Sequence, residues 1–202
     1  PTSPRSVYGH SKLAGEHELD PSHTIVRTSW VFGEHGHNIV KTILRLATEH
    51  ETMRFVDDQR GHPTAAADLA SMIVRLVVGR RPGVFHVTNQ GAVSWFEFAR
   101  SVMEAAGLDP QRVQPIGTAD LDPPRPAPRP ANSVLDNAAL RLSGVDLLPD
   151  PANTEDAHLL PLVFQAPADG VLALYHYKYL RRLAGPPDPP LATSTSHPPD
   201  AP

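Results

Sequence analysis

The feature that most limits the fold is a helical pattern standing between two segments with strand composition. Its apolar residues at helical spacing are Leu69, Met72, Ile73, Leu76 and Val77. This face is expected to pack on a core. The run 23–32 is rich in β-branched and aromatic residues and is bounded by Pro21 and Gly33, which predicts a buried strand, and 83–88 predicts another. Strand and helix patterns alternate to about residue 150, which predicts an α/β fold.

Local signals mark where the other elements begin and end. We predict further helices over 8–19, 39–47, 94–106 and 137–142, and further strands over 53–56 and 113–116. Asn38 and Thr64 stand at expected N-caps, and Ser94 with Glu97 has the spacing of a capping box. Asp68 is expected to tie its helix to a neighbouring loop. The segments 57–64 and 122–130 are predicted to be loops, the second because it is packed with proline.

The pattern divides the chain into three parts. Residues 1–150 are predicted to form the folded domain. Residues 151–184 form an extension of unassigned role, with one helix expected over 171–183. Residues 185–202 contain seven prolines among Ser, Thr and Asp and have little apolar surface to bury, so we predict a disordered tail.

Composition excludes several classes of function. The 202-residue chain has a formal net charge of −4, which gives no general attraction to nucleic acid or to an anionic membrane. It lacks cysteine, which excludes disulfides and thiolate metal sites, and it has neither a bilayer-spanning apolar run nor a signal peptide. We therefore expect a cytoplasmic protein that binds neither nucleic acid nor membrane. No metal site is expected, because the turn of Glu34, His35 and His37 is more typical of solvated side chains.

Tyr8 and Lys12 are the first candidate catalytic pair. They stand four residues apart in a predicted helix, so their side chains project from one face, about one turn apart. A phenol titrates at about 10 when unperturbed, and a nearby cation favours its phenolate. Such a pair can pass a proton during the reduction of a ketone. The alternative is a solvated helix face on which Tyr8 packs and Lys12 points to water.

Six motifs, in a fixed order, resemble the dTDP-4-dehydrorhamnose reductase family, a group of extended short-chain dehydrogenases. They are Tyr8-Gly-His-Ser-Lys-Leu-Ala-Gly-Glu16, Arg27-Thr-Ser-Trp-Val-Phe-Gly33, Asp58-Gln-Arg-Gly-His-Pro-Thr64, Asp68-Leu-Ala70, Ser94-Trp-Phe-Glu-Phe-Ala99 and Arg129-Pro-Ala-Asn-Ser-Val-Leu-Asp136. The resemblance covers about residues 1–148 and implies part of a Rossmann-type cofactor domain with a smaller substrate domain. It also implies the reduction of a 4-keto nucleotide-sugar by NADPH or NADH, in the synthesis of dTDP-L-rhamnose.

The resemblance assigns roles to individual residues. It implies that Tyr8 is the general acid at the C4 oxygen and that Lys12 binds the nicotinamide ribose. Thr28 and Ser29, at a strand end, are implied to contact the cofactor carboxamide. The residues implied to bind substrate are Trp30, Asn38, Gln59, His62, Thr64 and Arg129.

Structural alternatives stay open for the substrate-binding residues. Trp30 could be a core residue and Asn38 a helix cap, and Gln59, His62 and Thr64 could serve the loop alone. Arg129, whose planar guanidinium matches a diphosphate, competes with Arg125 for that role.

The sequence also departs from this family. It contains no G-x-G-x-x-G turn for the cofactor pyrophosphate, and the strand expected to supply a catalytic Ser or Thr is missing. We therefore expect the chain to correspond to the C-terminal portion of a reductase and to be inactive by itself. A regulatory homologue, similar to the β subunit of methionine adenosyltransferase, is the alternative. The choice between NADPH and NADH, the sugar and the base stay open, and association into a homodimer is expected from the family.

Overall fold

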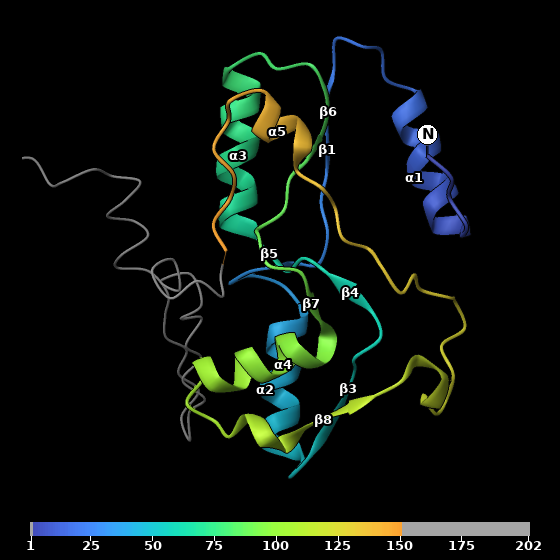
Figure 1. Cartoon of the computed structure of the whole chain (residues 1–202), viewed down its shortest axis with the longest axis vertical. Coiled ribbons are helices and arrows are strands. Elements are labelled where there is room, and N and C mark those ends of the chain that lie inside the picture. Colours follow the sequence, from blue (N-terminus) through green and yellow to red (C-terminus); the bar gives the residue numbers. More distant parts are fainter. Residues whose placement is uncertain (1, 151–202) are drawn as a thin grey trace, which may run out of the picture.

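The structure is a computed structural model that describes residues 2–150 (Figure 1). Its helices are α1 (Val7–His17), α2 (Ile39–Glu49), α3 (Ala66–Val78), α4 (Trp95–Ala105) and α5 (Ala138–Leu142), with 3-10 turns at Pro110–Arg112 and Thr118–Asp120. Its strands are β1 (Thr24–Arg27), β2 (Val31–Phe32), β3 (Met53–Val56), β4 (Arg60–Gly61), β5 (Thr64–Ala65), β6 (Gly83–His86), β7 (Val93–Ser94) and β8 (Val113–Ile116). The helix predicted over 171–183 and the tail predicted over 185–202 lie outside the described residues.

The strands form short pairs that join distant parts of the chain. β1 pairs in parallel with β6, β2 with β5, and β3 with β8. β4 pairs with β7 in the antiparallel sense, with Gly61 opposite Val93. The alternation of strands and helices that the sequence predicts is therefore confirmed as an α/β fold.

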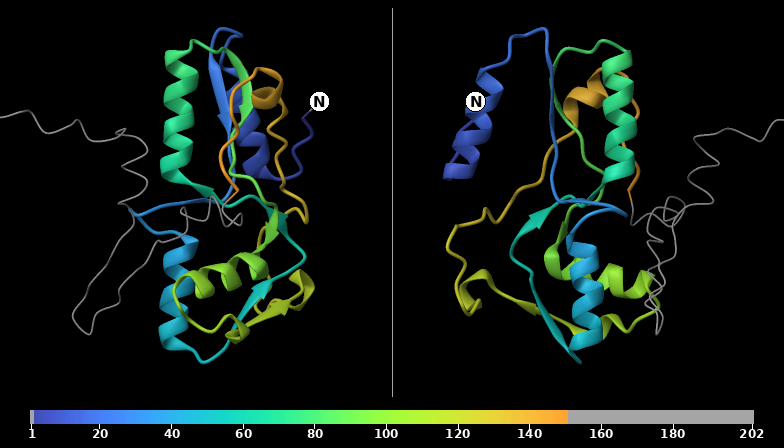
Figure 2. Two further views of the ribbon diagram at one scale, coloured as in Figure 1. Left: turned by 60° about the vertical axis from the view of Figure 1, so that its left-hand side comes forward. Right: turned by 180° about the vertical axis from the view of Figure 1, so that it is seen from behind.

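Two hydrophobic clusters form the core. The first lies between α2, α4, β3 and β8 at the lower end of Figure 1, and its fully buried members include Ile43 and Met103. The second lies where α3, α5 and β6 meet at the upper end, around Met72, Leu76 and Leu140. The short strands β2, β4, β5 and β7 run between these two ends, which Figure 2 shows from two further sides.

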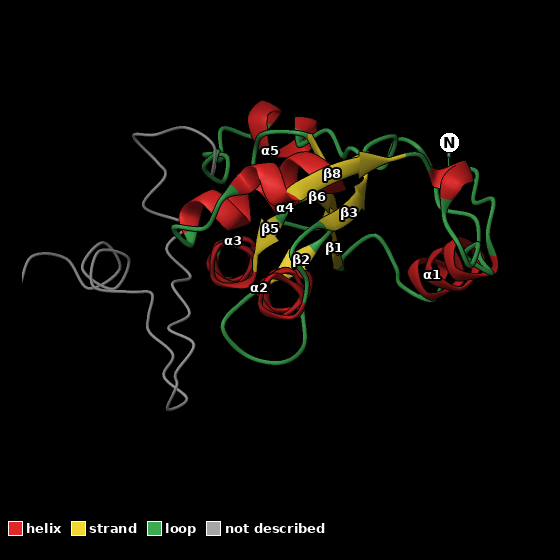
Figure 3. Cartoon of the chain, turned by 90° about the horizontal axis from the view of Figure 1, so that it is seen from below, coloured by secondary structure: helices red, strands yellow, loops and turns green. Residues whose placement is uncertain are grey.

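Helix α1 stands apart from both clusters (Figures 1 and 3). None of its residues is buried by the part of the chain that the structure describes. Ser6 caps it by accepting a hydrogen bond from the Gly9 amide at 3.1 Å. It is attached to β1 by an ion pair between Glu16 and Arg27.

Several local predictions are confirmed. The Asn38 side chain accepts from the Lys41 amide and so caps α2, and Ser94 and Glu97 form the capping box of α4. Asp68 does tie its helix to a loop, because its carboxylate accepts a hydrogen bond from the side-chain Nδ2 of Asn89 at 2.8 Å.

Other predictions are wrong. The segment 23–32 is two strands rather than one, because Trp30 has a φ of 46° that breaks the extended backbone. Thr64 lies in β5 and does not cap α3, whose N-cap is Ala65 without a side-chain hydrogen bond. The apolar face of α3 is also narrower than predicted, since Ile73 and Val77 are 38% and 60% exposed.

The predicted loop 57–64 contains β4 and the start of β5, which pair with residues distant in sequence. None of the helices in residues 2–150 is long and apolar enough to cross a membrane.

Candidate active site

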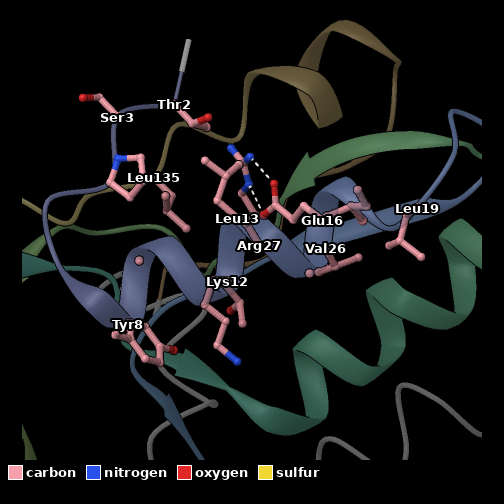
Figure 4. Close-up of a pocket in the computed structure, with 15 residues that line it drawn as sticks. Thr2, Ser3, Tyr8, Lys12, Leu13, Glu16, Leu19, Val26, Arg27 and Leu135 are labelled. Carbon is pink, nitrogen blue, oxygen red and sulfur yellow. Dashed lines mark hydrogen bonds and ion pairs between the residues drawn. The ribbon is translucent and has the colours of Figure 1, made fainter.

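Tyr8 and Lys12 lie on the same side of α1, as their spacing predicts. The Lys12 ammonium is 5.4 Å from the centre of the Tyr8 ring, within the range of a cation–π contact. Tyr8 is 72% exposed, so its hydroxyl is accessible to a ligand. Figure 4 shows both side chains at the edge of the hollow between α1 and β1.

This hollow has a volume of about 770 Å³ and is lined by α1, by β1 and by Thr28. Arg27 and Glu16 form a two-pronged ion pair across it, with Arg27 Nε 2.8 Å from Glu16 Oε1 (Figure 4). The hydrogen bond from Arg27 lowers the pKa of the Glu16 carboxyl below its ordinary value of 4.5. Thr28 Oγ1 is buried and has no hydrogen-bond partner among residues 2–150. An orphaned hydroxyl beside a hollow is a candidate ligand contact.

A second pocket of about 960 Å³ adjoins the first and shares Tyr8 and Thr28 with it. It brings together six of the predicted site residues: Tyr8, Thr28, Ser29, Trp30, Gln59 and Arg129. Its far wall is the proline-rich segment 126–130. The backbone of β4 holds this wall in place, because the Arg60 amide donates to Ala131 O and Arg60 O accepts from the Ser133 amide.

Trp30 forms the aromatic wall of this pocket together with Trp95. The two rings are stacked, with centroids 3.6 Å apart and planes 12° from parallel. The stack therefore occupies one face of the Trp30 indole, which leaves its edge and remaining surface for a ligand. The left-handed φ of Trp30 is a strained conformation for a bulky residue, at a cost on the order of 1–3 kcal/mol, and such strain is often found at functional sites.

Two predicted substrate contacts are satisfied within the protein. The Asn38 side chain donates to Gly33 O at 2.7 Å while it caps α2, which favours the structural interpretation. Thr64 is fully buried, and its hydroxyl donates a long hydrogen bond of 3.4 Å to His62 O. Neither residue lines the two pockets described above.

His62 also lies outside these pockets, but it supports one of their walls. Its carbonyl oxygen accepts a hydrogen bond from the Ser29 hydroxyl at 2.9 Å. His62 as a whole is 7% exposed, and burial lowers the pKa of its imidazole below the usual value. His62 Nδ1 has no hydrogen-bond partner in the described part of the chain.

The structure adds pocket residues that the sequence did not single out. One of them is Trp95, in the segment that begins α4. Arg5 and Ser133 also line the pocket. Arg125 does not, so Arg129 is the better placed of the two arginines.

The comparisons with known proteins agree with this geometry. Residues 1–152 match the model of the RmlD substrate binding domain. The chain is 44% identical over 149 residues to dTDP-4-dehydrorhamnose reductase of Mycobacterium tuberculosis, covering 71% of this chain and 48% of that protein. It is 40% identical over 148 residues to the spore coat polysaccharide biosynthesis protein SpsK of Bacillus subtilis, covering 72% and 51%.

Solved structures of related enzymes have the same fold. The dTDP-4-dehydrorhamnose reductase of Bacillus anthracis, in complex with NADP, superposes with a TM-score of 0.68 at 41% identity, covering 73% of this chain and 53% of that one. The orthologue from Clostridium acetobutylicum gives 0.71 at 36% identity, covering 78% and 56%. The chain thus spans about half the length of the relatives it matches. With a family match over most of its length, the chain belongs to the RmlD substrate binding domain family.

Proposed function

We propose that this chain forms the sugar-nucleotide pocket and supplies the proton donor of an NADP(H)-dependent 4-ketoreductase that acts on a dTDP-linked deoxysugar. The observation that supports this most directly is the 960 Å³ pocket, which places Tyr8 at the same cavity as Trp30 and Arg129. The named relatives support a reductase rather than the regulatory alternative.

Tyr8 serves in this proposal as the general acid. Reduction of a ketone adds a hydride to the carbonyl carbon and a proton to the oxygen, and the exposed phenol of Tyr8 donates that proton. Lys12 lies one turn away on the same helix, and its positive charge stabilises the phenolate that remains. Solvent then returns the proton to Tyr8.

The residues beside Tyr8 and Lys12 fit one end of a nicotinamide cofactor. The hollow under α1 offers the Lys12 ammonium and the orphaned Thr28 hydroxyl, which are suited to ribose hydroxyls and a carboxamide. When bound, NADPH supplies the hydride; the relative from Bacillus anthracis is in complex with NADP. NADPH is therefore proposed ahead of NADH.

The larger pocket suits a nucleotide-sugar. The aromatic wall of Trp30 and Trp95 offers apolar surface, and Gln59 and Ser29 offer polar groups. The Arg129 guanidinium, on the opposite wall, matches the oxygens of a diphosphate. Asn38, His62 and Thr64 contribute by shaping the backbone rather than by contact with the ligand.

Tyr8→Phe tests the chemical part of the proposal in the natural protein. Loss of the general acid is expected to lower kcat for a dTDP-4-keto-6-deoxysugar about 10²- to 10⁴-fold, with dTDP affinity unchanged. Leu142→Ala is a control, because Leu142 is 88% exposed and lies on α5, away from the pocket. A Tyr8→Phe protein with undiminished activity would remove Tyr8 from the mechanism.

A cytoplasmic location and association into a homodimer are proposed with the same function. Both follow from the family resemblance and from the composition of the chain, and size-exclusion chromatography with light scattering tests the second.

A further inference from the structure

Trp30, which has a strained backbone conformation, has two close contacts within the protein. Its ring stacks on Trp95 at 3.6 Å. It also lies against Gly61, where a Cβ atom would come within 2.6 Å of Trp30 Cε2 and 2.8 Å of Cζ2. Real Cβ contacts essentially never fall below 3.0 Å, so no residue larger than glycine fits at position 61 while the indole stays in place.

Gly61 lies in the short β4–β7 ladder, and Trp95 directly follows it. β4 pairs with β7 so that Gly61 faces Val93, and Trp95 begins α4 directly after β7. The hypothetical Cβ of Gly61 would also lie 2.9 Å from Ser133 Oγ, on the segment that continues from the proline-rich wall. One ladder therefore positions both contacts of Trp30 and borders the opposite wall of the pocket.

We propose that Gly61 is a positioning residue that, together with the stacked ring of Trp95, holds the Trp30 indole as a rigid wall of the nucleotide-sugar pocket and so determines its affinity for the ligand. This inference rests on the proposed function for the identity of the ligand, a dTDP-sugar. Neither residue takes part in the proton transfer, which is assigned to Tyr8. Their replacement therefore acts on KM and leaves kcat nearly unchanged.

The chain offers a spectroscopic readout that is specific to this contact. Its two tryptophans are Trp30 and Trp95, so the exciton couplet that stacked indoles produce in the far-ultraviolet circular dichroism spectrum arises from this pair. Gly61→Ala is expected to abolish the couplet, because the added methyl displaces the Trp30 ring. It is also expected to weaken dTDP binding, measured by calorimetric titration, about three- to tenfold. This is the effect of losing one aromatic contact between the Trp30 indole and the ligand.

Gly117→Ala is the matched control. A Cβ at Gly117 would also be crowded, 2.9 Å from Asp120 Oδ2, but that atom ends a flexible side chain that can turn away. The control should retain both the couplet and the dTDP affinity. Trp95→Leu is a second variant, which adds no atoms at Gly61 and is expected to raise KM with little change in kcat, even if Gly61→Ala does not fold.

The outcomes separate this inference from the proposed function. A Gly61→Ala protein that keeps both the couplet and the affinity, or that loses the couplet while its affinity stays unchanged, overturns the positioning role. A wild-type protein that shows the couplet but does not bind dTDP overturns the proposed function instead.

Discussion

Glu16→Gln is expected to release α1 from the rest of the protein without loosening either hydrophobic cluster. The carboxylate of Glu16 accepts hydrogen bonds from Nε and Nη2 of Arg27, and the two side chains are 20% and 28% exposed. Because no residue of α1 is buried by the described chain, little apolar packing backs up this contact. The amide of glutamine keeps the shape of the side chain and removes its charge.

The size of the effect follows from this geometry. A hydrogen bond to a charged group contributes about 1.5–3 kcal/mol, and partial exposure reduces that contribution through solvent screening. The glutamine amide can keep one neutral hydrogen bond to Arg27, so a net loss of about 1–2 kcal/mol is expected. That loss raises the open population of α1 by roughly 5- to 30-fold.

Native-state hydrogen exchange measures this opening directly. Protection of the α1 amides should fall in Glu16→Gln, while the amides of α3 and α4 keep theirs. Glu49→Gln is the matched control on α2, because the Arg45–Glu49 pair is 59% and 44% exposed and its loss should cost below about 0.5 kcal/mol. Equal protection losses in the two variants, or a loss spread evenly over all helices, would contradict the tethering role of Glu16.

The same contact predicts a dependence on pH. The hydrogen bond from Arg27 lowers the pKa of Glu16 in the folded protein below its ordinary value of 4.5. The stabilisation of α1 is therefore complete above about pH 4.5 and is lost as the pH falls through the lower pKa of the folded state. The α1 protection factors of the wild-type protein should decrease in this range, and those of Glu16→Gln should not.

Two further predictions concern stability, measured by urea unfolding. Asn89→Ala should lower the free energy of unfolding by about 2–4 kcal/mol. Asn89 is 1% exposed, and its side-chain amide accepts from the backbone N–H of Ala65 and donates to Asp68, so its loss leaves buried polar groups unpaired. A cost below about 1 kcal/mol would show that water replaces these bonds. Ser94→Ala should cost about 1–2 kcal/mol, because the buried Ser94 hydroxyl accepts from the Glu97 amide to cap α4 and donates to Asp57; a cost below about 0.5 kcal/mol would contradict this role of the cap.

Elements set by local chemistry were predictable from the sequence. The caps at Asn38 and Ser94 depend on residues within four positions, and the structure confirms both. The link from Asp68 to a loop also follows from the sequence, although no local pattern identifies its partner, Asn89.

The failures involve contacts between distant segments. The break at Trp30 depends on the pairing of β2 with β5 and on the stack with Trp95, and neither is visible within the run 23–32. Gly61 has no local turn that would reveal its role, because the ring it accommodates is 31 positions earlier in the chain. The same distinction between local and distant contacts applies to the residues that line the pocket. Thr28 and Ser29, at a strand end, were predictable from the sequence, whereas Trp95 was not.

The candidate site combines two elements of unequal rigidity. The aromatic wall is held by the β4–β7 ladder, whereas Tyr8 is carried by a helix whose main attachment to β1 is the ion pair of Arg27. Arg27 directly precedes Thr28 in the chain, so this tether joins Tyr8, the proposed proton donor, to the part of the pocket where both hollows meet. Loosening it should displace Tyr8 from a pocket that is otherwise intact. For this reason Glu16→Gln is expected to reduce kcat more than dTDP affinity, the reverse of the effect of Gly61→Ala.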